Sequence, residues 1–135
     1  MTELERARLM RAARDAQTHA YSPYSKFAVG AAVLDEHGQI HAGCNVENAA
    51  YPEGVCAEAA ALSAMVLAGG RRVRALAVIG EGVALVTPCG GCRQKLREFA
   101  ALDTLVLVGD REQARAEFTL AQLLPSSFGP EHLAS

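Results

Sequence analysis

Four cysteines carry the strongest chemical signal in this chain of 135 residues. Cys89 and Cys92 stand one helical turn apart in Pro88-Cys89-Gly90-Gly91-Cys92, so both sulfur atoms can face the same point. Cys56 adds a third thiol at the start of another predicted helix. Three protein ligands leave the fourth tetrahedral position of a zinc ion open for water, which distinguishes catalytic zinc sites from closed structural ones. We therefore expect one Zn²⁺ per chain, held by these three cysteines.

Glu58 lies two residues after Cys56, in the same predicted helical turn. Its carboxylate could reach a zinc-bound water without being a ligand, which is where a general base must lie. Thiolates at helix N-termini are stabilised by free N–H groups and by the positive end of the helix dipole. A glutamate on a helix is ordinarily a solvated surface residue, but the position of Glu58 between two zinc-competent elements favours a catalytic role.

Two other interpretations of the cysteines stay open. A Cys-x-x-Cys pair after a strand and at the start of a helix is also the signature of thiol oxidoreductases, although Cys56 and Glu58 have no role in such an enzyme. A structural zinc module would instead use Cys44 as a fourth ligand. The alternation of apolar residues between 39 and 45 argues against this module, because it places Cys44 in the core as a small hydrophobic residue.

The elements that must position these residues begin with a helix and a hairpin. Thr2 and Glu5 form a capping-box pattern, and apolar residues then repeat at helical spacing until Ser22-Pro23. Residues 27–34 and 39–45 predict two strands joined by a polar turn. An alanine-rich run from Cys56 to Ala68 predicts the next helix, which Gly69-Gly70 ends.

The second half of the chain alternates strands and helices. Residues 75–79 predict a buried strand, and a helix then starts with Thr87 as its cap and Pro88 in its first turn. Residues 104–108 predict the next strand, and weaker patterns indicate an edge strand at 116–118 and a short helix at 119–124.

This order of elements contains two consecutive strand-helix-strand units, which favour parallel pairing with right-handed crossovers. The predicted fold class is α/β, a three-layer α/β/α sandwich around a mixed five-stranded sheet. Helices of such folds begin at the carboxyl ends of strands, so Cys56 and Cys89 would meet in the crevice where ligands of open sheets usually bind.

The composition fits a single domain over residues 1–135, because half of the residues are apolar and can form one core. A formal net charge of −2 gives no basic surplus, so we expect no nucleic-acid partner. The N-terminus has no apolar signal core and no window is long and apolar enough to span a bilayer. We therefore expect no membrane association and a cytoplasmic location, where thiols favour metal binding over disulfides.

Five sequence blocks occur in the order of one known family. They are Tyr21-Ser22-Pro23-Tyr24-Ser25-Lys26-Phe27, Gly43-Cys44-Asn45-Val46-Glu47-Asn48-Ala49-Ala50-Tyr51, Cys56-Ala57-Glu58, Thr87-Pro88-Cys89-Gly90-Gly91-Cys92-Arg93-Gln94 and Leu123-Leu124-Pro125-Ser126-Ser127-Phe128. Cys-x-Glu followed by Pro-Cys-x-x-Cys is also the three-cysteine form of the zinc deaminase signature. Almost from end to end, the chain resembles the small, homotetrameric, zinc-dependent cytidine deaminases.

The resemblance implies hydrolysis of cytidine and 2′-deoxycytidine to uridine and 2′-deoxyuridine, a reaction of pyrimidine salvage. Glu58 would take a proton from the zinc-bound water and deliver protons to ring nitrogen 3 and to the departing ammonia. Asn45 and Glu47 would hydrogen-bond the ribose hydroxyls, since residues two apart in an extended segment point the same way and these groups suit a neutral diol.

The resemblance also implies the rest of the substrate pocket. Phe27 would pack against the base, and the backbone of Ala57 would bond the pyrimidine edge. Tyr51 and Phe128 would complete the pocket, with Phe128 coming from a neighbouring subunit of the homotetramer. Taken alone, aromatic residues such as these are more often part of a core than of a site.

Many members of the family carry arginine directly after the catalytic glutamate, whereas this chain has Ala59. The helix N-termini would then compensate more of the negative charge of the thiolates. A blasticidin-type deaminase is the nearest alternative activity, but Asn45 and Glu47 favour a simple nucleoside. A nucleotide is disfavoured because Glu47 would repel its phosphate.

Overall fold

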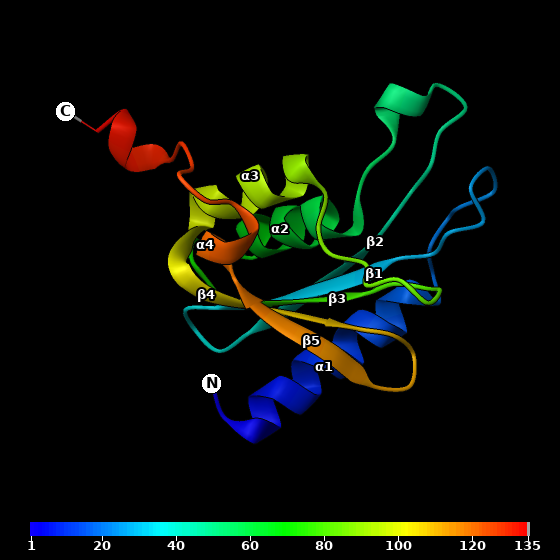
Figure 1. Ribbon diagram of the computed structural model, residues 1–135, viewed down its shortest axis with the longest axis horizontal. Coiled ribbons are helices and arrows are strands. Elements are labelled where there is room, and N and C mark those ends of the chain that lie inside the picture. The colour runs from blue at the N-terminus through cyan, green and yellow to red at the C-terminus, as the bar shows by residue number, and fades with distance from the viewer. Residues whose placement is uncertain (135) are drawn as a thin grey trace.

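The computed structural model describes residues 1–134 and has a mixed five-stranded sheet as its middle layer (Figure 1). The strands are β1 (Gly30–Asp35), β2 (Ile40–Cys44), β3 (Val73–Ile79), β4 (Ala100–Gly109) and β5 (Ala114–Thr119). They lie in the order β2-β1-β3-β4-β5. β3 and β4 pair in parallel, while β1 is antiparallel to both of its neighbours and β5 is antiparallel to β4.

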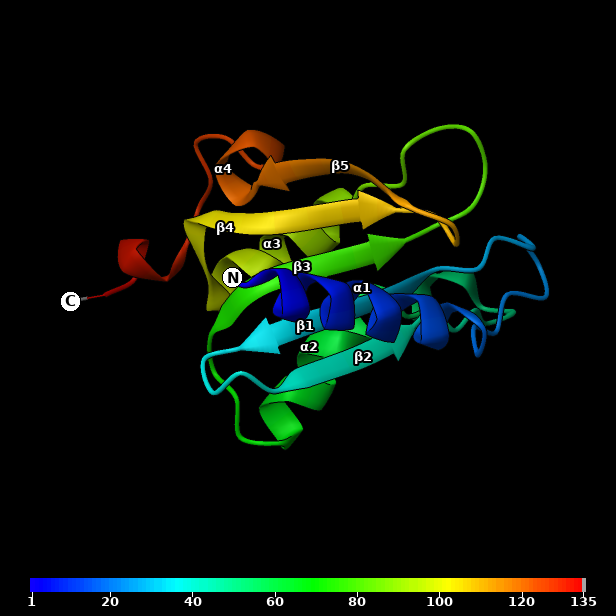
Figure 2. The same cartoon turned by 90° about the horizontal axis from the view of Figure 1, so that it is seen from below.

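Helices cover both faces of this sheet, as Figures 1 and 2 show. One face carries α1 (Glu3–Gln17), and the other carries α2 (Ala57–Leu67), α3 (Gly90–Phe99) and the short α4 (Leu120–Leu123). Alternation along β1 serves two cores: Ala31 and Val33 pack with the α2 and α3 side, and Ala32 and Leu34 pack with α1. The predicted three-layer α/β/α sandwich is confirmed. In residues 1–134, no helix is long and apolar enough to cross a membrane.

The first helix has the predicted start and an earlier end. The Thr2 hydroxyl accepts a hydrogen bond from the Glu5 backbone N–H, and the Glu5 carboxylate accepts one from the Thr2 N–H. The prediction that the helix continues to Ser22-Pro23 is wrong, because its last residue is Gln17. The chain then leaves the helical path so that the Tyr21 N–H can bond the Asn45 carbonyl and join the segment after β2.

Two further boundaries differ from the sequence prediction. Strand β1 begins at Gly30 rather than at residue 27, because the Phe27 carbonyl and the Val29 N–H bond the side chain of Asn45, while the Val29 carbonyl accepts from the Asn45 backbone N–H just after β2. Helix α3 is capped by Cys89 and not by Thr87, whose hydroxyl accepts a hydrogen bond from Arg93 instead.

The connections through α2 and α3 bring two helix N-termini to one end of the sheet. Strands β2 and β3 both run antiparallel to β1, so they point the same way but do not pair, and only β3 and β4 form the expected parallel neighbours. The predicted pairing in the first strand-helix-strand unit is therefore wrong, since β1 is inserted between its strands. The two helix starts nevertheless meet at one end of the sheet, as expected, because α2 and α3 each follow a strand end and start on the same side.

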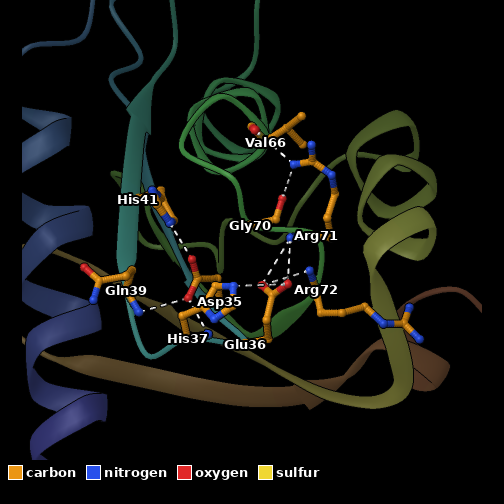
Figure 3. A network of polar contacts seen from close by, with 9 residues as sticks. All are labelled: Asp35, Glu36, His37, Gln39, His41, Val66, Gly70, Arg71 and Arg72. Carbon is orange, nitrogen blue, oxygen red and sulfur yellow. Dashed lines mark hydrogen bonds and ion pairs between the residues drawn. The ribbon is translucent and has the colours of Figure 1, made fainter.

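The opposite end of α2 is fixed by a polar network, which we call the Asp35 network (Figure 3). One Asp35 carboxylate oxygen accepts hydrogen bonds from the backbone N–H groups of His37 and Gln39, and the other lies 2.8 Å from His41 Nε2. Glu36 accepts from the backbone N–H groups of Arg71 and Arg72. The β1–β2 turn is thereby tied to the chain that leaves α2.

Candidate metal centre and active site

Three cysteine sulfur atoms meet where α2 and α3 begin. Cys56 is the N-cap residue of α2, Cys89 is the N-cap residue of α3, and Cys92 lies in the first turn of α3. All three Sγ atoms lie within 4.8 Å of one another, and those of Cys56 and Cys89 are 3.9 Å apart. Tetrahedral zinc with Zn–S bonds of about 2.3 Å separates its sulfur ligands by about 3.8 Å. The cluster therefore fits one ion of this kind.

The fourth cysteine does not belong to this cluster. Cys44 is the last residue of β2, is half-buried, and is absent from the group of sulfur atoms that surround one point. Its predicted burial is thus only partial. A closed four-cysteine zinc site is not formed by the described residues, which leaves a fourth coordination position for a non-protein ligand.

The electrostatics of the thiols also fit a cation. Burial raises the pKa of the Cys92 thiol, and the neighbouring Glu58 carboxylate and the other two thiols raise it further. Burial and the charge of Cys89 likewise raise the pKa of Cys56. For Cys89, hydrogen bonds from the Cys92 backbone and from the other thiols outweigh burial and lower the pKa. A bound dication would remove the repulsion among these groups, since zinc deprotonates a coordinating thiol.

Glu58 lies beside the thiols in the first turn of α2 and is only 6% exposed. Burial raises the pKa of its carboxyl group, and the residue's own backbone N–H offsets only part of this effect. A carboxyl group with a raised pKa exchanges protons more readily near neutral pH than a solvated one does. The backbone of Ala57 is buried in the same turn. The arrangement can therefore place a proton carrier next to a metal-activated water.

Asn45 and Glu47, the residues expected to bind a sugar, hold the segment before β1. The Asn45 amide accepts from the Val29 N–H at 2.9 Å and donates to the Phe27 carbonyl at 2.8 Å. The Glu47 carboxylate accepts from the backbone N–H groups of Tyr24 and Ser25 and from the Ser25 hydroxyl. These bonds, led by that of the Ser25 hydroxyl, lower the pKa of Glu47. The side chains are thus fixed in place, with further hydrogen-bonding capacity left for a ligand.

The predicted aromatic residues do not all lie together. Tyr51 packs edge-on against Tyr24 with ring centroids 6.0 Å apart, at the rim of a cavity of about 380 Å³ that also includes Glu47. Phe27 is 38% exposed and does not line this cavity. The cysteines and Glu58 do not line it either. Within one chain, the predicted site is therefore an open set of residues rather than a closed pocket.

Phe128 lies away from this region. It precedes the 3-10 helix η2 (Pro130–His132), which Figures 1 and 2 place at the opposite end of the molecule from η1 (Tyr51–Glu53). The structure thus does not bring Phe128 and Tyr51 of one chain together.

Sequence reasoning missed the residues that hold the predicted ones. It assigned no role to Ser25, which links Glu47 to the Phe27 backbone through its hydroxyl. It also missed Arg97, which bonds Ser127 beside Phe128. The signal for Ser25 was its place in the first family block, two residues before Phe27.

Comparisons with known proteins also indicate a zinc-binding deaminase. Residues 4–108 match the family model described as the cytidine and deoxycytidylate deaminase zinc-binding region. The chain is 42% identical over 127 residues to a cytidine deaminase of Sporosarcina psychrophila, covering 94% of this chain and 93% of that protein. It is 40% identical over 130 residues to a cytidine deaminase of Halalkalibacterium halodurans, covering 96% and 98% of the two chains.

Solved structures give the same result. The crystal structure of a cytidine deaminase from Burkholderia pseudomallei superposes with a TM-score of 0.86 at 38% identity, covering 95% of this chain and 100% of that one. A cytidine deaminase from Mycobacterium tuberculosis gives a TM-score of 0.81 at 38% identity, covering 96% and 99%. The family's zinc-binding region and the three-cysteine cluster together confirm the predicted zinc cofactor. The chain belongs to the cytidine deaminase family, whose members are zinc-dependent hydrolases of C–N bonds.

Proposed function

We propose that this protein hydrolyses the 4-amino group of cytidine and 2′-deoxycytidine, which yields uridine or 2′-deoxyuridine and ammonia. The observation that carries the proposal is the meeting of three cysteine sulfur atoms with the buried Glu58 at the N-termini of α2 and α3. Relatives at about 40% identity bear the name cytidine deaminase, which supports the same substrate class.

The proposed chemistry uses Glu58 as the only proton carrier. Cys56, Cys89 and Cys92 would hold the zinc ion, which would supply a Lewis acid that makes an adjacent water more acidic. Glu58 would take a proton from the attacking water as the water oxygen bonds to ring carbon 4. The carboxyl group would then protonate ring nitrogen 3, take the second proton from the hydroxyl now on carbon 4, and give it to the departing amino group. The C–N bond breaks, ammonia leaves, and the oxygen remains as the carbonyl of the uracil ring.

The substrate contacts follow from the residues around this centre. The Ala57 backbone would bond the pyrimidine edge, and Phe27 would pack against the base. Asn45 and Glu47 would bond the ribose hydroxyls with the capacity not used by the segment 24–29. A ribose hydroxyl that binds Glu47 would share the carboxylate with the Ser25 hydroxyl. Because the carboxylate is negatively charged, it would repel a phosphate and suits a neutral diol better.

Completion of the pocket requires another subunit. Tyr51 lies at the cavity rim, but η2, which Phe128 precedes in the same chain, is at the other end of the molecule. We therefore propose that Phe128 is supplied by a neighbouring subunit of a homotetramer. A nucleoside substrate, no nucleic-acid partner and a cytoplasmic location complete the proposal. The negative net charge supports the second of these, because nucleic-acid binding requires a basic surface.

The test is an ultraviolet assay of purified protein with cytidine, 2′-deoxycytidine, cytidine monophosphate and blasticidin S. We expect turnover of the two nucleosides and little turnover of the nucleotide. Glu58→Gln should lower kcat by about a thousandfold or more while zinc content stays unchanged. Glu112→Gln, which changes an exposed glutamate in the turn before β5, is the matched control and should retain wild-type kcat.

Two results would overturn the proposal. Turnover of blasticidin S without turnover of cytidine would replace the substrate, and full activity of zinc-loaded Glu58→Gln would remove Glu58 from the reaction.

A further inference from the structure

A buried arginine holds the C-terminal segment Ser127–His132 against α3. Arg97 is buried, its Nε donates to the Ser127 hydroxyl at 2.8 Å, and its Nη2 donates to the Glu131 carboxylate. Gly129 lies directly on the guanidinium, because a Cβ atom there would be 2.3 Å from Arg97 Cζ. One helical turn earlier, Gln94 donates to the Phe128 carbonyl at 2.8 Å. We call these contacts the Arg97 clamp.

The Arg97 clamp presents an aromatic pair to its surroundings. The rings of Phe128 and His132 stack with centroids 4.9 Å apart and planes 17° from parallel. The Gly129 N–H donates to His132 Nδ1 at 3.0 Å, which fixes the imidazole ring in this position. Phe128 nevertheless remains 57% exposed. One face of its ring is therefore covered by His132, and the opposite face is open.

Fixing the segment Ser127–His132 contributes little to the stability of its own chain. Between Ser127 and His132 only Gly129 is buried, so fixing the segment adds almost no apolar burial to the cores. The clamp also requires a charged side chain to be taken out of water. The clamp does fix the orientation of the Phe128 ring. The segment that carries it leads into η2, at the end of the molecule away from η1.

We infer that Arg97 is a positioning residue, which with Gln94 and Gly129 holds Phe128 so that its open face enters the nucleoside site of a second copy of this chain. The inference rests on the proposed function, since it assigns the ligand of Phe128 as the nucleoside bound there. An aromatic ring fixed on one face offers the other to a planar base or to a sugar at low entropic cost.

The first measurement is the kinetics of Arg97→Ala with cytidine. Because Phe128 would bind substrate without taking part in proton transfer, KM should rise by about tenfold while kcat changes less than threefold. Zinc content should stay at the wild-type value. Arg115→Ala removes an exposed arginine of β5 and is the matched control, with unchanged KM expected.

The second measurement distinguishes a Phe128 that contacts substrate in its own chain from one that contacts substrate in a neighbouring chain. Arg97→Ala chains and Glu58→Gln chains, carrying different affinity tags, are co-expressed and purified through both tags. A site with Glu58 from one chain and a correctly held Phe128 from the other would be intact in this mixed assembly. We therefore expect a component that combines a wild-type KM with a kcat near the wild-type value, a combination that neither variant shows alone. Phe128→Ala in place of Arg97→Ala should give the same result.

Several outcomes would overturn the inference. One is a wild-type KM for correctly folded Arg97→Ala, and another is a doubly tagged assembly without the wild-type KM component. If Arg97→Ala does not fold, Gly129→Ala displaces the guanidinium without removing its charge and should raise KM in the same way, and an unchanged KM there counts against the clamp. Failure of the proposed function is recognised separately, by full activity of Glu58→Gln alone.

Discussion

The two ends of helix α2 collect ionisable groups in opposite ways. At the C-terminal end, in the Asp35 network, each carboxylate meets backbone N–H groups, and His41 pairs with Asp35 (Figure 3). At the N-terminal end, burial raises the pKa of Cys56 and Cys92, and the charges of Glu58 and Cys89 raise both further. Arg71 adds to the order of the first end, because it donates to the Val66 and Gly70 carbonyls at the helix terminus.

This difference separates structure from chemistry. The Asp35 network is complete within the protein, so its polar groups stabilise the connection between β1, β2 and α2. The cysteine cluster lacks a counter-charge among its own groups and is completed only by a cation. We therefore expect the polar end without its own counter-charge to be the end that binds a ligand and reacts.

Removing zinc should produce the largest change. A strong chelator should abolish cytidine turnover and lower Tm, and added zinc should restore both. The stabilisation lost would be about 4 kcal/mol if free zinc had been at a thousand times its dissociation constant. A chelator that removes the zinc and leaves activity intact would contradict the account.

The effect of zinc on Tm should also depend on pH. Burial raises the pKa of Cys56 and Cys92, so zinc must displace protons from these thiols near neutral pH. Apparent zinc affinity, and with it the gain in Tm, should therefore be greater at pH 8 than at pH 6. Thermal denaturation at both pH values, with free zinc held constant, measures this difference. An equal gain at both would mean that the thiols are already ionised without metal.

Breaking the Asp35 network should destabilise the fold without changing the chemistry. Asp35→Ala leaves two backbone N–H groups and His41 without their acceptor, at a cost of about 2 kcal/mol or more. Asp35→Asn retains one acceptor oxygen and should lose less. Urea unfolding gives the free energies, and kcat per folded molecule should stay at the wild-type value. A fall in kcat at unchanged stability would show that the two ends of α2 are not independent.

Acid should weaken the same network. Burial alone would raise the pKa of Asp35, but hydrogen bonds from His41 and from two backbone N–H groups outweigh it and lower the pKa. The stabilisation is then complete above the unfolded pKa of about 3.8 and is lost as the pH falls through the lower folded value. The free energy of unfolding of Asp35→Asn should depend less on pH in this range. If the wild type and Asp35→Asn show the same pH dependence, the acid sensitivity comes from other carboxylates.

A cation added at the reactive end should have the smallest effect. Ala59 lies one residue after Glu58 on α2. In Ala59→Arg, a guanidinium that reaches the thiolates should shift the acidic limb of the pH–rate profile downward by up to about one unit. Ala59→Gln is a matched variant of similar reach without charge and should not shift it. An unchanged acidic limb in folded Ala59→Arg would show that the added guanidinium does not offset the negative charge of the thiolates.

Much of the fold and the centre of the site could be predicted from local patterns. The Thr2 capping box, the Gly69-Gly70 stop after α2 and the position of Cys56 and Cys89 at helix starts all depend on near neighbours in the sequence. The convergence of the two helix starts followed from the strand-helix-strand order alone.

The errors arise where distant segments compete with a local preference. The start of β1 depends on the Asn45 side chain, and the end of α1 depends on the contact of Tyr21 with the chain after β2. The insertion of β1 between β2 and β3 depends on which strand edges pair. The Arg97 clamp joins two segments about thirty positions apart, and no spacing rule connects them.

The coordination of the metal is the most direct test of the central claim. Zinc K-edge X-ray absorption of the purified, zinc-loaded protein reports the number and type of ligand atoms. The account predicts three sulfur atoms at about 2.3 Å and one oxygen or nitrogen atom at about 2.0 Å from zinc. Four sulfur atoms, or a zinc ion without sulfur ligands, would contradict it.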